Sequence, residues 1–235
     1  MKIGILKCGD VAAPMIDQFG HYSDCLIKHI GLDEIAQIHE WNVYQQHALP
    51  SSTDECDAYV IGGSPSGVND NATWIDSLAT FIRQAFKAQK PLVGICFGHQ
   101  AIHYALGGQV EKSDQGWGLG AYDVTFKQSL GSFSHGDGLN ILSIHQDQVI
   151  ALAPNFESVA GSDFCPHFVT RYKNTVLTIQ GHPEFTPAFL LNLIKQRQDI
   201  LQQKVHALPD FGLERPLDHT AFNQILRNHL QQLHD

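Results

Sequence analysis

Basic residues are scarce in this sequence, and they form no cluster. The 235 residues include 15 Lys and Arg against 24 Asp and Glu, which gives a formal net charge of −9. A surface of this sign repels a phosphate backbone, so we expect no nucleic-acid partner. No apolar run is long enough to span a bilayer, and residues 1–8 lack the pattern of a signal peptide. We therefore expect no membrane partner either.

Cysteine is also sparse, and its spacing does not indicate a disulfide framework. The five cysteines lie at positions 8, 25, 56, 96 and 165, an odd number with no repeated interval. This pattern is typical of a reducing compartment, so we expect a cytoplasmic protein. Internal repeats and low-complexity linkers are missing too, and the length and the 43% hydrophobic content suit one domain over residues 1–235.

What the sequence does contain is an alternation of strand-like and helix-like segments. Short apolar or alternating segments favour strands, and longer segments with one apolar face favour helices. Since strands that alternate with helices form parallel sheets covered on both faces, we predict a three-layer α/β fold with a mainly parallel sheet. Strand-like segments dominate between residues 108 and 180, which indicates some antiparallel pairing. The expected strands include 2–7, 36–44, 58–62 and 92–96, and the expected helices include 12–30, 73–89, 187–206 and 218–233.

The most informative segment is residues 92–100, Leu-Val-Gly-Ile-Cys-Phe-Gly-His-Gln. A buried strand here ends at Cys96 and turns sharply into a helix, and Gly94 and Gly98 suit the tight turn and close packing of such an elbow. A helix N-terminus favours negative charge, so a thiol at this position ionises readily and becomes a nucleophile. The alternative is a buried core cysteine.

A second segment supplies partners for such a nucleophile. Residues 176–184 read Val-Leu-Thr-Ile-Gln-Gly-His-Pro-Glu, another buried strand that runs out into His182 and Glu184. Side chains two apart in an extended segment point the same way. His182 is therefore a candidate base and Glu184 the group that orients it. Taken singly, each residue also suits an ordinary surface position.

These two segments resemble the motifs of class I (triad-type) glutamine amidotransferases. A third segment agrees, because residues 59–67 read Tyr-Val-Ile-Gly-Gly-Ser-Pro-Ser-Gly, and a Gly-Gly loop after a strand supplies an oxyanion-hole amide in that family. The resemblance implies oxyanion donors at the backbone N–H groups of Gly63 and Phe97 and a flavodoxin-like fold. It covers a catalytic core of about 1–185, followed by a helical extension of about 186–235. The stand-alone chain resembles the glutaminase part of GMP synthase.

The resemblance also implies substrate contacts. Gln100 lies four residues after Cys96 on the same side of a helix, and in the family this position contacts the amino-acid end of the substrate. The alternative is an ordinary surface glutamine. Ser143, His145 and Gln146 lie where the family uses a loop to hold the substrate carboxylate, and His145 suits a structural role equally well.

No cofactor or metal is expected. His99 and His103 have i,i+4 spacing on the elbow helix, but no third ligand is evident and the Glu of the metalloprotease motif is missing. A Walker-type loop is absent as well, so we expect no ATP-using part. Gly118 departs from the family, since many members carry an acidic residue there.

The resemblance implies hydrolysis of the glutamine side-chain amide through a γ-glutamyl thioester, with ammonia passing to a separate synthetase partner. The first alternative is a free-standing hydrolase of γ-glutamyl peptides or conjugates, because the acyl half of the reaction is the same. A non-catalytic binding protein is a further alternative, which the intact Cys96, His182 and Glu184 disfavour. The sequence leaves open whether the chain forms a homo-oligomer.

Overall fold

A central sheet of nine strands organises the computed structural model, which describes residues 1–199, 201 and 205–231. The strand order is β2-β1-β3-β4-β13-β12-β11-β7-β8. The first five run parallel and the other four pair antiparallel, so the predicted three-layer α/β fold with a mainly parallel sheet is confirmed. The bounds are β1 Lys2–Lys7, β2 Gln37–Asn42, β3 Ala58–Ile61, β4 Leu92–Ile95, β7 Val124–Phe126, β8 Gly138–Leu139, β11 Glu157–Gly161, β12 Val169–Tyr172 and β13 Val176–Ile179.

Two small sheets lie beside the central one. In the first, β10 (Asp147–Ala151) pairs antiparallel with β5 (Gln109–Lys112). In the second, β6 (Trp117–Leu119) lies between β9 (Ile144–His145) and β14 (Val205–His206). The short strands between residues 108 and 180 agree with the strand-rich region that the sequence predicts.

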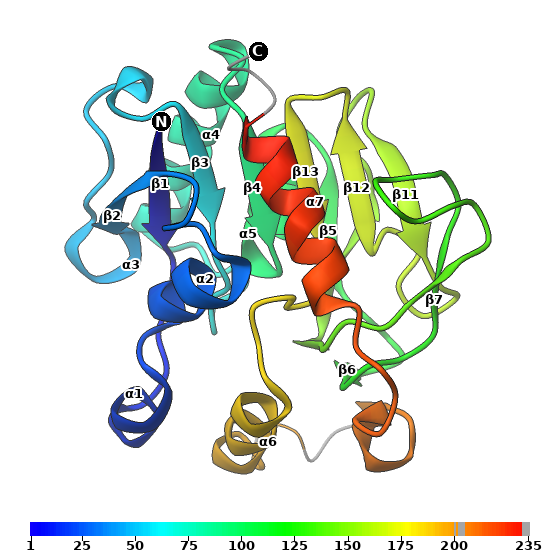
Figure 1. The fold of residues 1–235 in the computed structure, drawn as a ribbon. Coiled ribbons are helices and arrows are strands. Elements are labelled where there is room, and N and C mark those ends of the chain that lie inside the picture. The colour runs from blue at the N-terminus through cyan, green and yellow to red at the C-terminus, as the bar shows by residue number, and fades with distance from the viewer. Residues whose placement is uncertain (200, 202–204, 232–235) are drawn as a thin grey trace.

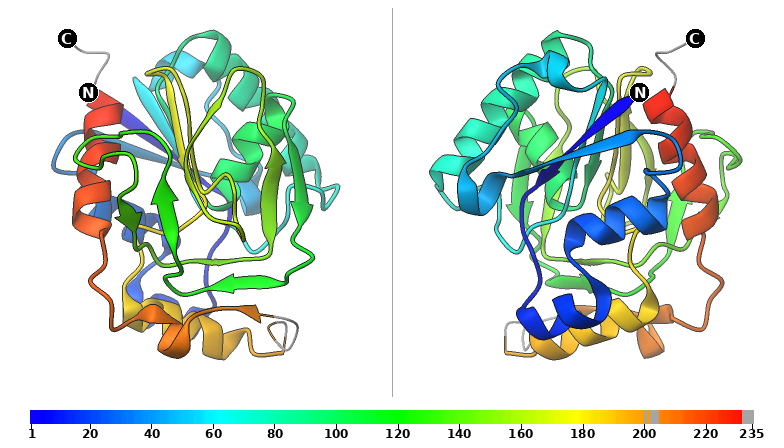
Figure 2. Two further views of the ribbon diagram at one scale, coloured as in Figure 1. Left: turned by 90° about the vertical axis from the view of Figure 1, so that its right-hand side faces the viewer. Right: turned by 60° about the vertical axis from the view of Figure 1, so that its left-hand side comes forward.

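Helices cover both faces of the central sheet (Figures 1 and 2). On one face lie α2 (Tyr22–Ile30) and α7 (His219–Gln231), and on the other lie α4 (Thr73–Lys87) and α5 (Phe97–Ala105). Each pair packs apolar side chains onto the strands, which makes two separate core layers. None of the helices in the described residues is long and apolar enough to cross a membrane.

Two further helices lie at the carboxyl edge of the parallel strands, α1 (Ala13–Phe19) and α6 (Pro187–Gln196) (Figure 1). They share a third apolar cluster with Leu142 and Ile144, below the sheet. In parallel α/β sheets, the loops at the carboxyl edge of the strands form the binding sites. Helices α1 and α6 cover this edge of the central sheet (Figure 1). The remaining short elements are α3 (Val43–Gln46) and the 3₁₀ turns η1 (Thr53–Glu55) and η2 (Pro209–Gly212).

The helix predicted over 12–30 is wrong as a single element. Gly20 adopts a φ of 82° and ends α1, and its N–H donates to the carbonyl of Ile16. His21 then starts α2 as its N-cap, with the carboxylate of Asp24 accepting from the His21 backbone N–H. The chain thus changes direction where the apolar periodicity suggested continuity. The strand predicted over 36–44 also ends early, because the Asn42 side chain caps α3.

The first helix of the C-terminal extension, predicted over 187–206, is shorter than predicted. That helix ends at Gln196 instead of residue 206, and residues 205–206 form β14. Within that stretch, residues 200 and 202–204 lie outside the described residues. The second helix, predicted over 218–233, is α7 (His219–Gln231), and its last predicted residues also lie outside the described part.

Candidate active site

Cys96 occupies the turn between β4 and α5, with φ 53° and ψ −103°. A non-glycine residue in this region is strained, as expected of a nucleophile presented on an elbow. The two flanking glycines permit the turn. A Cβ on Gly94 would lie 2.6 Å from the Gly98 carbonyl oxygen, and one on Gly98 would lie 2.0 Å from the carbonyl oxygen of Ile61. Both positions therefore require glycine.

His182 and Glu184 follow β13 and lie next to the elbow. The Nδ1 atom of His182 is 2.8 Å from Oε1 of Glu184, and both side chains are almost fully buried. The backbone N–H of His182 donates to the Leu142 carbonyl at 2.7 Å, and its ring stacks on Phe185 with centroids 3.9 Å apart. These contacts fix the imidazole on two sides.

Electrostatics favour the protonated form of this imidazole. Burial opposes the charged ring, but the charges of Cys96 and Glu184 and hydrogen bonds to both residues outweigh it and raise the pKa of His182 to about 10. Glu184 occupies Nδ1, which leaves the other ring nitrogen to interact with the Cys96 sulfur. The three side chains that the sequence singled out are thus brought together in one chain of contacts.

A fourth side chain, which the sequence reasoning missed, also contacts the sulfur. The Nε2 group of Gln180 donates to Sγ of Cys96 at 3.6 Å, and Oε1 of Gln180 accepts from Nε2 of Gln100 at 3.1 Å. The Gln100 Nε2 group also donates to the Asp147 carbonyl at 2.9 Å. The sequence could have predicted this contact, because Gln180 precedes His182 by two residues on the same extended segment, and side chains two apart in such a segment point the same way.

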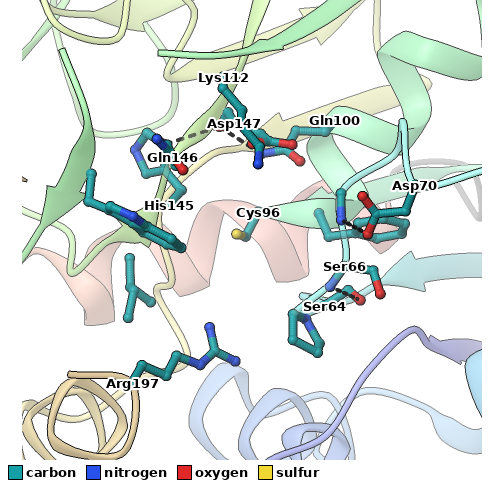
Figure 3. Close-up of a pocket in the computed structure, with 15 residues that line it drawn as sticks. Ser64, Ser66, Asp70, Cys96, Gln100, Lys112, His145, Gln146, Asp147 and Arg197 are labelled. Atoms are coloured by element: carbon teal, nitrogen blue, oxygen red, sulfur yellow. Dashed lines mark hydrogen bonds between the residues drawn. The ribbon is translucent and has the colours of Figure 1, made fainter. Parts of the chain in front are cut away.

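A cavity of about 290 Å³ opens beside Cys96 (Figure 3). Figure 3 shows the sulfur between Arg197 on one side and Gln100, Lys112 and Asp147 on the other. Burial raises the pKa of Asp147, nearby Lys112 lowers it and nearby Asp70 raises it, so the far end of the cavity holds opposing charges. The lining residues are Ser64, Pro65, Ser66, Gly67, Asp70, Cys96, Phe97, Gln100, Lys112, Trp117, Ile144, His145, Gln146, Asp147 and Arg197.

Of the predicted oxyanion donors, Phe97 lines this cavity as the first residue of α5. Backbone N–H groups in the first turn of a helix have no partner within the helix, so they can bind an anion. Gly63 lies beside the histidine, since a Cβ there would be 3.0 Å from Cε1 of His182. A larger residue would therefore push the imidazole out of place.

The predicted carboxylate-binding loop is brought to the cavity only in part. His145 and Gln146 line the cavity. The Ser143 side chain is instead fully buried, and its hydroxyl donates to the Ile141 carbonyl at 3.4 Å.

The His145 ring is bound on both nitrogens. One lies 2.6 Å from the Tyr122 hydroxyl and the other 3.2 Å from the Asp147 carbonyl. Burial lowers the pKa of His145 to about 3, so the ring is neutral and fixed in place.

Gly118 has a packing reason for its departure from the family. A Cβ at this position would lie 2.6 Å from Cε1 of Phe164 and 3.1 Å from Nε2 of His145. An acidic side chain would therefore clash with both rings. The packing of these two rings therefore leaves no room for a side chain at position 118.

The histidines of the elbow helix are part of the core. His99 and His103 are fully buried, and their rings bond the hydroxyls of Thr178 at 2.6 Å and Thr170 at 2.8 Å. Burial lowers the pKa of both rings, that of His103 to about 3. Among the described residues there is no cluster of three or more His, Cys, Asp or Glu that is arranged to hold a metal ion.

The other four cysteines are buried and unlike Cys96 in their surroundings. Burial raises the pKa of Cys8, and it raises those of Cys25 and Cys165 to about 12 and that of Cys56 to about 11. These thiols are therefore protonated at neutral pH.

The family model described as glutamine amidotransferase class-I matches residues 15–195. The chain therefore belongs to the class I glutamine amidotransferase family, whose members are cysteine-type amidotransferases and hydrolases. It is 26% identical over 187 residues to gamma-glutamyl peptidase 3 of Arabidopsis thaliana, and the alignment covers 75% of this chain and 74% of that protein.

Solved structures agree on the fold. A glutamine amidotransferase of Thermotoga maritima superposes with a TM-score of 0.73 and 19% identity, covering 99% of this chain and 97% of the other. A GMP synthase-like protein of Thermoplasma acidophilum superposes with a TM-score of 0.60 and 17% identity, covering 86% of this chain and 98% of the other.

Proposed function

We propose that this chain cleaves the amide C–N bond of a γ-glutamyl compound through a thioester on Cys96. The observation that carries the proposal is the chain of contacts from the sulfur through His182 to Glu184, next to an open cavity. A nucleophile, a base and a group that orients the base are the parts that acyl transfer requires.

In the first half of the reaction the thiolate of Cys96 attacks the γ-carbonyl carbon. The N–H groups of Phe97 and Gly63 stabilise the oxyanion that forms, and each such donor is worth roughly 3 kcal/mol. The C–N bond then breaks as His182 gives its proton to the leaving nitrogen. Glu184 holds the imidazole in the required tautomer.

In the second half, water hydrolyses the thioester. The neutral His182 takes a proton from the water as its oxygen attacks the carbonyl carbon. Collapse of the tetrahedral intermediate expels the Cys96 thiolate and releases glutamate, which restores the starting protonation state.

The amino-acid end of the substrate would occupy the far end of the cavity. Gln100 and Asp147 offer oxygens for an α-ammonium group, and Lys112 and the loop at Gln146 offer donors for an α-carboxylate. The hydroxyl of Ser143 is not part of this proposal, because it is bonded in the core.

Two leaving groups are compatible with this chemistry. Glutamine would release ammonia, which a separate synthetase chain could use. A γ-glutamyl peptide would release a shorter peptide or an amino acid. The peptide is favoured by one observation, that the cavity continues past Cys96 to Arg197 (Figure 3), where glutamine has no atoms to place.

The test is release of glutamate by the purified chain, supplied with glutamine or with a γ-glutamyl dipeptide, with Cys96→Ala as the variant. We expect the variant to lose turnover on the order of 10³-fold or more while its unfolding transition is unchanged, because alanine keeps the Cβ at this strained position. Mass spectrometry of the wild-type chain should detect the acyl adduct on Cys96. Glutamate release that persists in the variant would contradict the mechanism.

A further inference from the structure

Arg197 brings a positive charge to the side of the pocket away from Lys112. It directly follows α6, in the C-terminal extension, and its guanidinium points toward the sulfur of Cys96 (Figure 3). The remaining charged lining residues are Asp70, Lys112 and Asp147, and Figure 3 shows them on other sides of the sulfur. A substrate bound with its amino-acid end near Gln100 therefore has Arg197 on its leaving-group side.

Neutral groups contact Arg197 at its backbone and at its guanidinium. The backbone N–H of Arg197 donates to the carbonyls of Leu193 and Ile194, each at 3.1 Å, and its Nη2 donates to the Tyr22 hydroxyl at 3.4 Å. Tyr22 is itself buried and stacks on Phe185, which also stacks on the catalytic imidazole. Arg197 is thus tied to the framework that positions the chemistry.

No carboxylate of the described residues neutralises the charge of Arg197. Within the part of the chain that the structure describes, no ion pair includes Arg197. The side chain is half-buried, so water screens its charge only in part. A cation held by a phenol and aimed into a cavity is suited to an anionic ligand, and guanidinium matches a carboxylate with two parallel hydrogen bonds.

We propose that Arg197 binds the C-terminal carboxylate of a γ-glutamyl peptide, so that the preferred substrates are short γ-glutamyl peptides with a free carboxylate on the leaving group. This inference rests on the proposed function and adds the substrate class. His182 protonates the leaving amine, and the products are glutamate and an amino acid or peptide that keeps its carboxylate. Ammonia, the leaving group of glutamine, offers Arg197 nothing to bind.

The experiment compares two substrates that differ in one group, a γ-glutamyl dipeptide with a free C-terminal carboxylate and the same dipeptide with a C-terminal amide. The wild-type chain should favour the carboxylate in kcat/KM. Arg197→Gln should reduce the carboxylate-over-amide ratio roughly 10- to 100-fold, mainly through KM, since hydrogen bonds to a charged group contribute about 1.5–3 kcal/mol. Arg197→Lys should retain part of the ratio, because it keeps the charge and loses the paired geometry.

Lys195→Gln is the matched control. It removes a positive charge two residues away, from an exposed position that does not line the pocket, and it should keep the wild-type ratio. A ratio equally low in both variants would indicate a long-range charge effect and overturn the proposal. An unchanged ratio in Arg197→Gln, or no preference in the wild type, would overturn it too while the Cys96 chemistry stands.

The proposed function fails separately. If no γ-glutamyl compound, glutamine included, gave glutamate in a reaction that Cys96→Ala abolishes, both the function and this inference would be wrong. If glutamine alone were cleaved, the function would stand and the role of Arg197 would not.

Discussion

Gln180 offers its side-chain amide N–H to the sulfur of Cys96. Its own carbonyl is held by Gln100, so the amide cannot turn over without breaking that bond. A neutral donor of fixed orientation stabilises a thiolate relative to a thiol. We therefore regard Gln180 as a positioning residue for the nucleophile.

Replacing this side chain should slow the chemistry without unfolding the protein. Gln180→Leu removes the donor to sulfur, and we expect kcat to fall roughly 10- to 100-fold, since a hydrogen bond to a charged group contributes about 1.5–3 kcal/mol. The alkylation rate of Cys96 at neutral pH, measured with iodoacetamide, should fall in parallel. Gln148→Leu is the control, because Gln148 is also buried and lies in neighbouring β10. Wild-type alkylation in Gln180→Leu would refute the role.

The residues of the site differ in how well they could be predicted from the sequence. Cys96, His182 and Glu184 could be predicted because their chemistry depends on short-range spacing within two segments. The burial of the Ser143 hydroxyl could not be predicted, since the spacing of a loop does not reveal which side chain turns into the core. Arg197 could not be predicted at all, because its role depends on where the end of a helix far along the chain from Cys96 meets the pocket.

At the scale of elements, α7 supports the segment that carries His182, the proposed base. Nδ2 of Asn223 donates to the Pro183 carbonyl at 3.0 Å and to the His29 carbonyl at 2.9 Å, so it joins α7 and α2 to the His-Pro-Glu turn. The N–H of Leu142, whose carbonyl accepts from His182, donates to the ring of His219 at 3.3 Å. The extension is therefore part of the scaffold of the site.

Asn223→Leu should weaken both the fold and the catalytic geometry. It leaves the buried carbonyl of Pro183 and the partly buried carbonyl of His29 without their donor, at a cost of about 1–3 kcal/mol for the buried one, and allows the Pro183 turn to move. We expect a lower free energy of unfolding in urea together with a lower kcat for glutamate release. Asn228→Leu, at an exposed position of the same helix, should change neither by a comparable amount. Equal effects in the two variants would mean that α7 has no special link to the base.

Element boundaries were less predictable than element types. The core strands could be read from their apolar runs, and α4 and α7 from their apolar faces. The break at Gly20 was missed because both sides of it continue an apolar face. The early end of α6 was missed because residues 205–206 pair with β6, a contact between segments far apart in the chain.

On the scale of the whole molecule, burial of neutral histidines connects stability to pH. Burial lowers the pKa of several histidines. The pKa of His103 and His145 falls to about 3, and the pKa of His219 and His229 falls to about 4. The pKa of His99 is lowered as well. In the unfolded chain the same rings take up protons below about pH 6.5. The unfolded state then binds more protons, so stability is complete above about pH 6.5 and decreases as the pH falls toward 4. His182 has a raised pKa, so its contribution to stability is fully present below about pH 6.5 and does not fall in this range.

We expect the free energy of unfolding, measured in urea, to fall steadily between about pH 6.5 and pH 4.5. His229→Gln should reduce that slope by up to one proton, about 1.4 kcal/mol per pH unit at most. His135→Gln, at an exposed position, serves as the control and should keep the wild-type slope. A flat dependence in the wild type would contradict the assignment. A single cooperative transition is also what the predicted single domain requires.

The burial of the other four cysteines has a consequence for handling the protein. Cys8, Cys25, Cys56 and Cys165 are closed in the core as protonated thiols, whereas Cys96 opens into the cavity. A dilute fluorescent alkylating dye would therefore react with the sulfur of Cys96 alone in each correctly folded molecule. The dye bound per mole of chain would then count the correctly folded molecules in a preparation without the need for a substrate.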